Sequence, residues 1–157
     1  MVINSIRRFL DFLAKMGLSV RDDPPKVLDV ASRRWSAPVD GFALSAEPVP
    51  SDDPEAVPAI SVALRNVGAT IARLEIPLWL AFYRIEVSGA APTAYGRALL
   101  KSQQQSGRQS ITLMPGAAVE THLPVGALYA VRRGAPAEVW IHCEPQGNPL
   151  SVMTSIM

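Results

Sequence analysis

The sequence contains a single cysteine, Cys143, and no long run of apolar residues. One cysteine excludes an intramolecular disulfide and fits a reducing compartment, so we expect a cytoplasmic protein. No stretch reaches the roughly 20 apolar residues that a membrane-spanning helix needs. Residues 1–20 lack a convincing signal-peptide cleavage site, so we expect them to stay in the mature chain.

The chain also lacks an excess of charge of either sign. Fifteen lysines and arginines oppose 14 aspartates and glutamates, which gives a formal net charge of +1. A balanced chain has no general electrostatic attraction for nucleic acid or for an anionic membrane. We therefore interpret the arginine pairs as solvent-exposed surface; they are Arg7–Arg8, Arg33–Arg34 and Arg132–Arg133.

Catalytic signatures are missing as well. The sequence has no G-x-S-x-G elbow, no HExxH zinc motif and no glycine-rich phosphate-binding loop. Cys143 shares a strand face with Val139 and Ile141, and an apolar environment makes a thiol inert. We therefore predict a protein that is not an enzyme and that holds no cofactor.

What the sequence does contain is a set of short segments in which apolar and polar residues alternate. There are 14 prolines, close to twice the average share of about 5%, and they favour short elements with frequent turns. Alternation with a period of two predicts strands that bury one face. The predicted inward sets are Phe42 and Leu44; Ile60, Val62 and Leu64; Ala72, Leu74 and Ile76; Tyr83, Ile85 and Val87; Ile111 and Leu113; Val119, Thr121 and Leu123; Val139, Ile141 and Cys143.

These segments follow one another about every 10 residues, with no helical pattern between them. Residues 94–102 are predicted as a weaker strand, and residues 78–87 as one continuous strand that carries Trp79 and Phe82 into the core. Such spacing is typical of an all-β, immunoglobulin-like Greek-key β-sandwich of seven or eight strands, here over residues 39–157. The interruption at Arg65-Asn66-Val67-Gly68 is interpreted as a strand-to-strand bend, because Asn and Gly tolerate positive φ.

Ahead of the sandwich, residues 1–18 have the period of one amphipathic α-helix. Its apolar stripe is predicted to bind a partner; it consists of Ile6, Phe9, Leu10, Leu13 and Met16. Three burial sites stay open for this stripe: the chain's own sandwich, a groove on another protein, or a membrane surface. Residues 19–38 are predicted as a linker or irregular strap that Trp35 attaches to the domain.

The turn and strand motifs carry a family resemblance over about residues 39–145. "LRNVG", "ITLMPGAAVE", "LPVGALY" and "VWIHCE" occur in that order. The run resembles the immunoglobulin-like domain that precedes the catalytic domain of deuterolysin-type metalloendopeptidases, and the bacterial intracellular proteinase inhibitor domain. The resemblance implies a sandwich fold and allows inhibition of a proteinase, but the missing HExxH motif excludes the protease activity.

One group of residues has the chemistry of a metal site. Glu120 and His122 share one strand face, and His142 and Glu144 share the outward face of another strand together with Trp140. Two imidazoles and two carboxylates could hold zinc if those strands were neighbours in a suitable register. The alternative is that all four face solvent.

These observations predict a non-enzymatic protein–protein interaction module, a bacterial adaptor or assembly subunit that uses its helix and its sandwich edge or loops. The partner is another protein chain and not a nucleic acid. The alternative is a proteinase inhibitor that presents residues 88–97 or 103–109 to a protease. The third hypothesis is a metal-binding protein.

Overall fold

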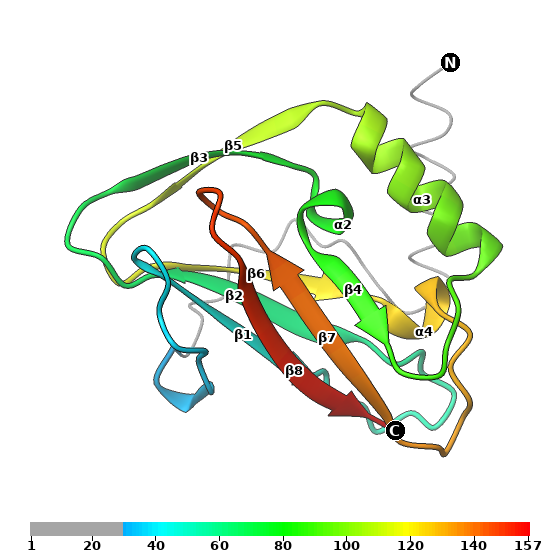
Figure 1. Ribbon diagram of the computed structural model, residues 1–157. Helices are drawn as coiled ribbons and strands as arrows, with labels where there is room; N and C mark the ends of the chain where they lie inside the picture. The colour runs from blue at the N-terminus through cyan, green and yellow to red at the C-terminus, as the bar shows by residue number, and fades with distance from the viewer. Residues whose placement is uncertain (1–29) are drawn as a thin grey trace.

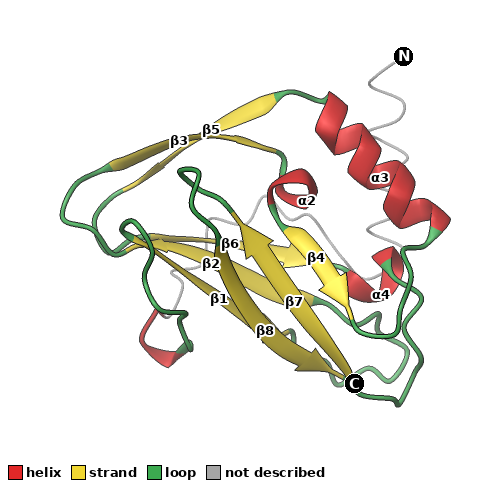
Figure 2. Ribbon diagram, viewed as in Figure 1, coloured by secondary structure: helices red, strands yellow, loops and turns green. Residues whose placement is uncertain are grey.

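The computed structural model describes residues 30–157, and these residues form a mostly β structure with eight strands (Figures 1 and 2). The predicted helix over residues 1–18, with Ile6, Phe9, Leu10, Leu13 and Met16, lies outside the described residues. The elements are η1 (Val30–Ser32), β1 (Phe42–Pro48), β2 (Ile60–Asn66), β3 (Ala72–Pro77), α2 (Trp79–Phe82), β4 (Arg84–Val87), α3 (Ala94–Gln105), β5 (Arg108–Leu113), β6 (Ala118–Leu123), α4 (Val125–Leu128), β7 (Ala137–Cys143) and β8 (Leu150–Ile156).

The strands form three sheets in which every pairing is antiparallel. One three-stranded sheet has the order β1-β2-β6, another has the order β4-β7-β8, and β3 pairs with β5 alone. In Figure 1 the β4-β7-β8 sheet lies in front of the β1-β2-β6 sheet, and β8 contacts β1. Two separate sheets therefore face each other across the molecule.

A single hydrophobic core fills the space between these sheets. Leu44 and Val62 of the first sheet and Val139 and Ile141 of the second are fully buried in the same cluster. Full burial of such a side chain contributes roughly 1.5–3 kcal/mol. The predicted inward faces of β3 and β7 are confirmed, because burial alternates along these strands and the assigned apolar residues are the buried ones. In β1 and β2 the assigned residues are buried as well, but so are residues on the opposite face, among them Ser45 and Ser61.

The continuous strand predicted over residues 78–87 is wrong. Residues Trp79–Phe82 form one helical turn, which ends where the Tyr83 N–H donates to the Trp79 carbonyl at 2.8 Å. Helical spacing brings the three rings together: the Trp79 and Tyr83 rings stack at 5.6 Å, and Phe82 lies 4.9 Å from Tyr83. This turn lets the chain leave β3, which pairs with β5, and enter β4, which pairs with β7.

The weak strand predicted over residues 94–102 is also wrong, because this segment is the helix α3. Thr93 caps its start by accepting a hydrogen bond from the Gly96 N–H at 3.0 Å. Tyr95 and Leu99, four residues apart, pack against the core, as residues on one helix face do. At the other end, Gln103 Oε1 accepts a hydrogen bond from the Leu80 N–H at 2.7 Å, which joins α3 to α2.

The last strand, β8, was not predicted from the sequence. Its buried ends, Leu150 and Ile156, enclose residues 151–155, in which the exposed Met153 and the polar Thr154 interrupt the alternation of apolar and polar side chains, so its sequence pattern is weak. It nevertheless pairs with β7 along its whole length, from Leu150 opposite Cys143 to Ile156 opposite Ala137. Pairing with a buried central strand thus decides its structure.

The bend at residues 65–68 is confirmed as the connection between β2 and β3, but it does not use positive φ. Positive φ occurs nearby at Asp40 and Gly41 instead. The buried Asn66 side chain holds the bend, because its Nδ2 donates to the carbonyls of Thr70 at 2.8 Å and Leu113 at 2.9 Å. Its Oδ1 accepts from the Gly68 N–H at 3.0 Å.

Gly96→Ala tests the close approach of α3 to α4. A Cβ at this position would lie 2.3 Å from the Leu128 carbonyl oxygen, so the helices would have to separate. Overpacking of this kind costs about 1–3 kcal/mol, which exceeds the roughly 1 kcal/mol of helix propensity that alanine gains over glycine. We expect a lower free energy of unfolding in urea denaturation.

The exposed Ser102→Ala on the same helix is the control and should change the free energy of unfolding little. A Gly96→Ala variant as stable as the parent would show that α3 does not need this contact.

Candidate functional site

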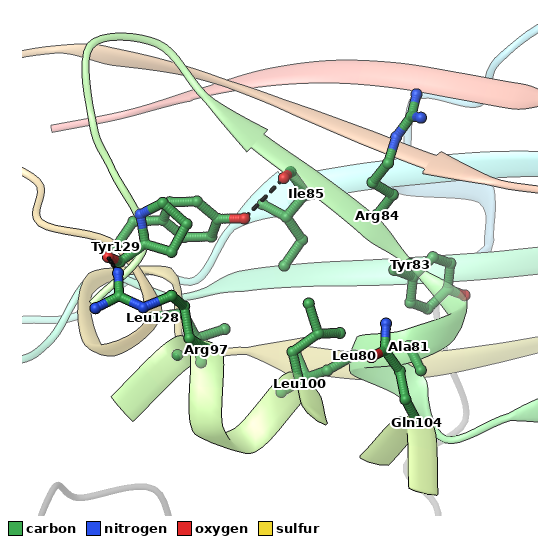
Figure 3. Close-up of a pocket in the computed structure, with 12 residues that line it drawn as sticks. Leu80, Ala81, Tyr83, Arg84, Ile85, Arg97, Leu100, Gln104, Leu128 and Tyr129 are labelled. Atoms are coloured by element: carbon green, nitrogen blue, oxygen red, sulfur yellow. Dashed lines mark hydrogen bonds between the residues drawn. The ribbon is translucent and has the colours of Figure 1, made fainter. Parts of the chain in front are cut away.

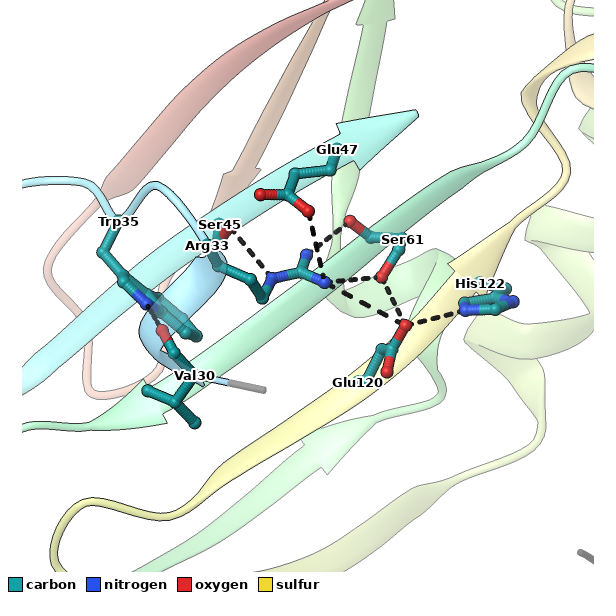
Figure 4. A network of polar contacts seen from close by, with 8 residues as sticks. All are labelled: Val30, Arg33, Trp35, Ser45, Glu47, Ser61, Glu120 and His122. Carbon is teal, nitrogen blue, oxygen red and sulfur yellow. Dashed lines mark hydrogen bonds and ion pairs between the residues drawn. The ribbon is translucent and has the colours of Figure 1, made fainter. Parts of the chain in front are cut away.

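The outer face of the β1-β2-β6 sheet carries a buried arginine. Arg33 extends over this face, and its side chain is only 6% exposed. Its Nε donates to Ser45 Oγ at 3.1 Å, its Nη1 to Ser61 Oγ at 2.9 Å and its Nη2 to the Ser61 carbonyl at 2.8 Å (Figure 4). Three directed hydrogen bonds therefore attach the segment before β1 to the sheet.

Two carboxylates and a histidine complete this network. Glu47 and Glu120 each lie 4.0 Å from Arg33 Nη1. Ser61 Oγ donates to Glu120 Oε1 at 2.5 Å, and His122 Nε2 lies 2.8 Å from the same oxygen. Burial raises the pKa of Glu120, but the hydrogen bonds from Ser61 and His122 and the charges of His122 and Arg33 outweigh it, so the pKa is lowered overall.

The assignment of Arg33 to exposed surface was wrong. Ser45 and Ser61 occupy outward positions of β1 and β2, yet both are buried beneath the Arg33 side chain. A long basic side chain can cover a sheet face in this way when hydroxyl and carboxylate groups satisfy its donors. Small polar residues at outward positions of adjacent strands were the signal in the sequence.

The structure does not bring the four metal candidates together. Glu120 and His122 lie on β6 in one sheet, whereas His142 and Glu144 lie on and just after β7 in the other. His142 Nδ1 is 2.7 Å from Ser151 Oγ. Within residues 30–157, no group of three or more His, Cys, Asp or Glu side chains is placed to hold a metal ion.

Cys143 is buried in the core, as predicted. Burial, with a smaller effect of Glu144, raises the pKa of its thiol to about 12. At neutral pH the nucleophilic thiolate is therefore scarce.

The first inhibitor segment is not an extended loop. Residues 88–97 include the start of α3, and Thr93 Oγ1 donates to the Ala127 carbonyl at 2.8 Å. The second segment, residues 103–109, likewise contains the end of α3 and the start of β5. The second segment is thus mostly held in regular structure, and the first is helical from residue 94 onward and attached to residue 127 by Thr93.

The outer face of the β4-β7-β8 sheet presents two large apolar side chains. Trp140 on the central strand is 41% exposed, and Met153, its direct partner on β8, is 43% exposed. The His142 ring lies parallel to Trp140 at 6.3 Å, and Glu138 is exposed on the same strand face. We call these four residues the Trp140 surface: Glu138, Trp140, His142 and Met153.

A cavity of about 350 Å³ lies between α3, α2, β4 and α4. Apolar side chains line most of it, among them Leu80, Ile85, Leu100 and Leu128 (Figure 3). Tyr129 lies at one end, where its hydroxyl donates to the Ile85 carbonyl at 2.7 Å. Nothing in the sequence indicates this cavity, because its wall includes α3, whose residues have the pattern of a weak strand.

Comparisons with known proteins assign no family to the chain. No protein-family model and no curated protein sequence matches it. The GAE domain of GGA2p from Saccharomyces cerevisiae matches over 80% of this chain and 94% of that domain, at 8% identity and a TM-score of 0.27. This likeness is too low to support a fold or a function. These comparisons do not support the resemblance to the deuterolysin or inhibitor domains.

Across residues 30–157, no helix has both the length and the apolar character needed to span a membrane.

The lowered pKa of Glu120 predicts a pH-dependent contribution to stability. A carboxyl whose pKa is lower in the folded state stabilises the fold above its unfolded pKa, about 4.3, and loses that effect as the pH falls through the folded value. We expect the parent to be more stable than Glu120→Gln at pH 7. This difference should shrink as the pH falls below about 5, as measured by urea denaturation.

Ser61→Ala provides the comparison, because it removes a hydrogen bond that lowers the Glu120 pKa. When both proteins also carry Ser61→Ala, the change with pH in the difference between their free energies of unfolding, with and without Glu120→Gln, should be smaller. A difference between parent and Glu120→Gln that stays constant from pH 7 to pH 3 would contradict this account.

Proposed function

We propose that the protein is a non-enzymatic protein–protein interaction module, an adaptor or assembly subunit, that binds another chain through the Trp140 surface. The observation that carries the proposal is the direct pairing of Trp140 with Met153 on the solvent side of the sheet. The other outward positions of β7 and β8 hold Glu138, His142, Ser151 and Ser155. An apolar pair among such polar neighbours is the arrangement found at the centre of a binding patch.

Tryptophan is especially suited to such a role. A single Trp side chain buries about 150–250 Å², and truncation of an interface Trp frequently costs 2 kcal/mol or more. Trp140 lies on the middle strand of its sheet, so β4 and β8 support it on both sides. The platform is therefore ordered before a partner arrives, which limits the entropic cost of binding.

An immunoglobulin-like topology is part of this proposal, and the strand order supports it. If β3 and β4 are counted as one strand interrupted by α2, the three-stranded sheets have the orders first-second-fifth and third-sixth-seventh. Constant-type immunoglobulin sandwiches place A, B, E and D in one sheet and C, F and G in the other, so six of the seven strands are divided in the same way. The fourth strand differs, because β5 pairs with β3 and does not join the β1-β2-β6 sheet. Such folds present binding surfaces on sheet faces, edges and loops.

The predicted N-terminal helix is proposed as a second contact with the partner. Its stripe of Ile6, Phe9, Leu10, Leu13 and Met16 is apolar, and an isolated helix of this length is marginal in water. Insertion into a groove on another chain would bury the stripe.

Trp140→Ser tests the proposal in the full-length chain. The tagged parent and variant are expressed in the native cell, and co-purified proteins are quantified by mass spectrometry. We expect at least one partner of the parent to fall about tenfold or more with the variant, because a loss of 1.4 kcal/mol weakens binding tenfold. Trp140→Phe should retain part of the binding.

The matched control is Ile71→Ser, which removes an exposed apolar side chain (48% exposed) beside β3. It should leave partner recovery unchanged, and circular dichroism should show that both serine variants are folded. Equal partner recovery by the parent and Trp140→Ser would overturn the proposal.

Deletion of residues 1–20 tests the helix separately. We expect it to reduce recovery of the same partner while the thermal unfolding transition of the domain is kept. Unchanged recovery of the partner would show that the helix does not contribute to binding and that the Trp140 surface is the contact.

A further inference from the structure

We propose that the cavity between α3 and β4 is a binding site for a small amphipathic carboxylate, a molecule with an apolar body and one carboxylate group. The site lies apart from the Trp140 surface: none of the four residues of that surface lines it. The proposal therefore does not depend on the proposed function.

The size and lining of the cavity fit a small ligand with an apolar part. Its volume of about 350 Å³ is within the range of small-molecule sites, roughly 300–1,000 Å³. The leucines at positions 80, 100 and 128 line it together with Ile85. Figure 3 shows Leu100 of α3 directed toward Ile85 of β4, so the two walls come from different elements.

The charges around the cavity select an anion. Two of the lining residues are arginines, Arg84 and Arg97, and no aspartate or glutamate lines it. Arg84 is paired with Glu86, whose Oε1 lies 3.8 Å from the Arg84 Nε, so Arg97 is the arginine that we assign to the anion. Figure 3 shows Arg84 directed away from the other lining residues, whereas Arg97 lies at the end of the cavity formed by Leu128 and Tyr129. Arg97 Nη1 donates to the Pro92 carbonyl at 2.7 Å, which positions the guanidinium there. A guanidinium next to an apolar volume matches a carboxylate on an apolar chain.

An extended peptide fits this cavity less well than a small molecule. Addition of a strand to β4 would require free backbone groups along its outer edge. The Ile85 carbonyl already accepts from the Tyr129 hydroxyl at 2.7 Å, and the Val87 carbonyl accepts from the Ala90 N–H at 3.3 Å. Two backbone acceptors on the outer edge of β4 are thus already occupied, and the cavity lies between side chains and not along the strand backbone.

The walls are held in place without a ligand. Thr93 and Gly96 fix the start of α3 against α4, and Gln103 fixes its end to the Leu80 N–H. The Leu100 side chain is 38% exposed, so solvent contacts an apolar residue of the cavity wall. A preformed apolar site with one oriented charged group is the usual form of a small-molecule site.

Binding is tested on the full-length protein with sodium octanoate and octanamide as probes, by isothermal titration and by NMR shifts of the ¹⁵N-labelled chain. The two probes have the same apolar chain, and only octanoate is charged. We expect saturable 1:1 binding of octanoate, at least about tenfold tighter than octanamide, with shifts centred on α3, β4 and α4. Arg97→Gln should abolish the preference for octanoate, and Leu100→Trp should abolish binding of both probes.

The matched control is Arg73→Gln, which removes an exposed arginine of β3 outside the cavity and should preserve the preference. The proposal is overturned if octanoate does not saturate, if Arg97→Gln and Arg73→Gln have the same effect, or if the shifts lie elsewhere. It is also overturned if octanoate binds only after deletion of residues 1–20, because the cavity would then belong to the chain's own N-terminal segment.

Discussion

The fold depends on one core that two separate three-stranded sheets must share. Leu44 and Val62 on one side and Val139 and Ile141 on the other are removed from water only when the sheets face each other. This requirement fixes which residues of each strand point outward. It therefore also places Arg33 with its network on one outer face and Trp140 on the other, so both surfaces follow from the burial of the same core.

The strand faces were the part of the fold that could be predicted from the sequence, because alternation is a local property of a half-buried strand. α3 was missed because its apolar contacts to the core are few, with Tyr95 and Leu99 only partly buried. Its start is determined by the Thr93 cap and its position by Gln103, which lies 23 residues from its partner Leu80. β8 was missed because pairing with β7, not its own pattern, orders it.

The candidate sites depend even more on contacts between distant residues. The outward serines of β1 and β2 are visible in the sequence, but Arg33 meets Ser61 across 28 residues and Ser61 meets Glu120 across 59, so no local pattern could reveal which groups these serines bind. The metal hypothesis failed for the same reason, since β6 and β7 belong to different sheets. The outward position of Trp140, by contrast, followed from the sequence. Its 41% exposure became clear only once the neighbours of its sheet were placed.

The central claim is that the outer face of the β4-β7-β8 sheet is the interface, and photo-crosslinking in intact cells tests it most directly. A benzophenone amino acid is placed at Met153 in one full-length chain and at the exposed Ser102 of α3 in another. The account predicts that irradiation links a discrete partner to the chain labelled at position 153 and not to the chain labelled at position 102. No adduct from position 153, or the same adduct in equal yield from both positions, would contradict it.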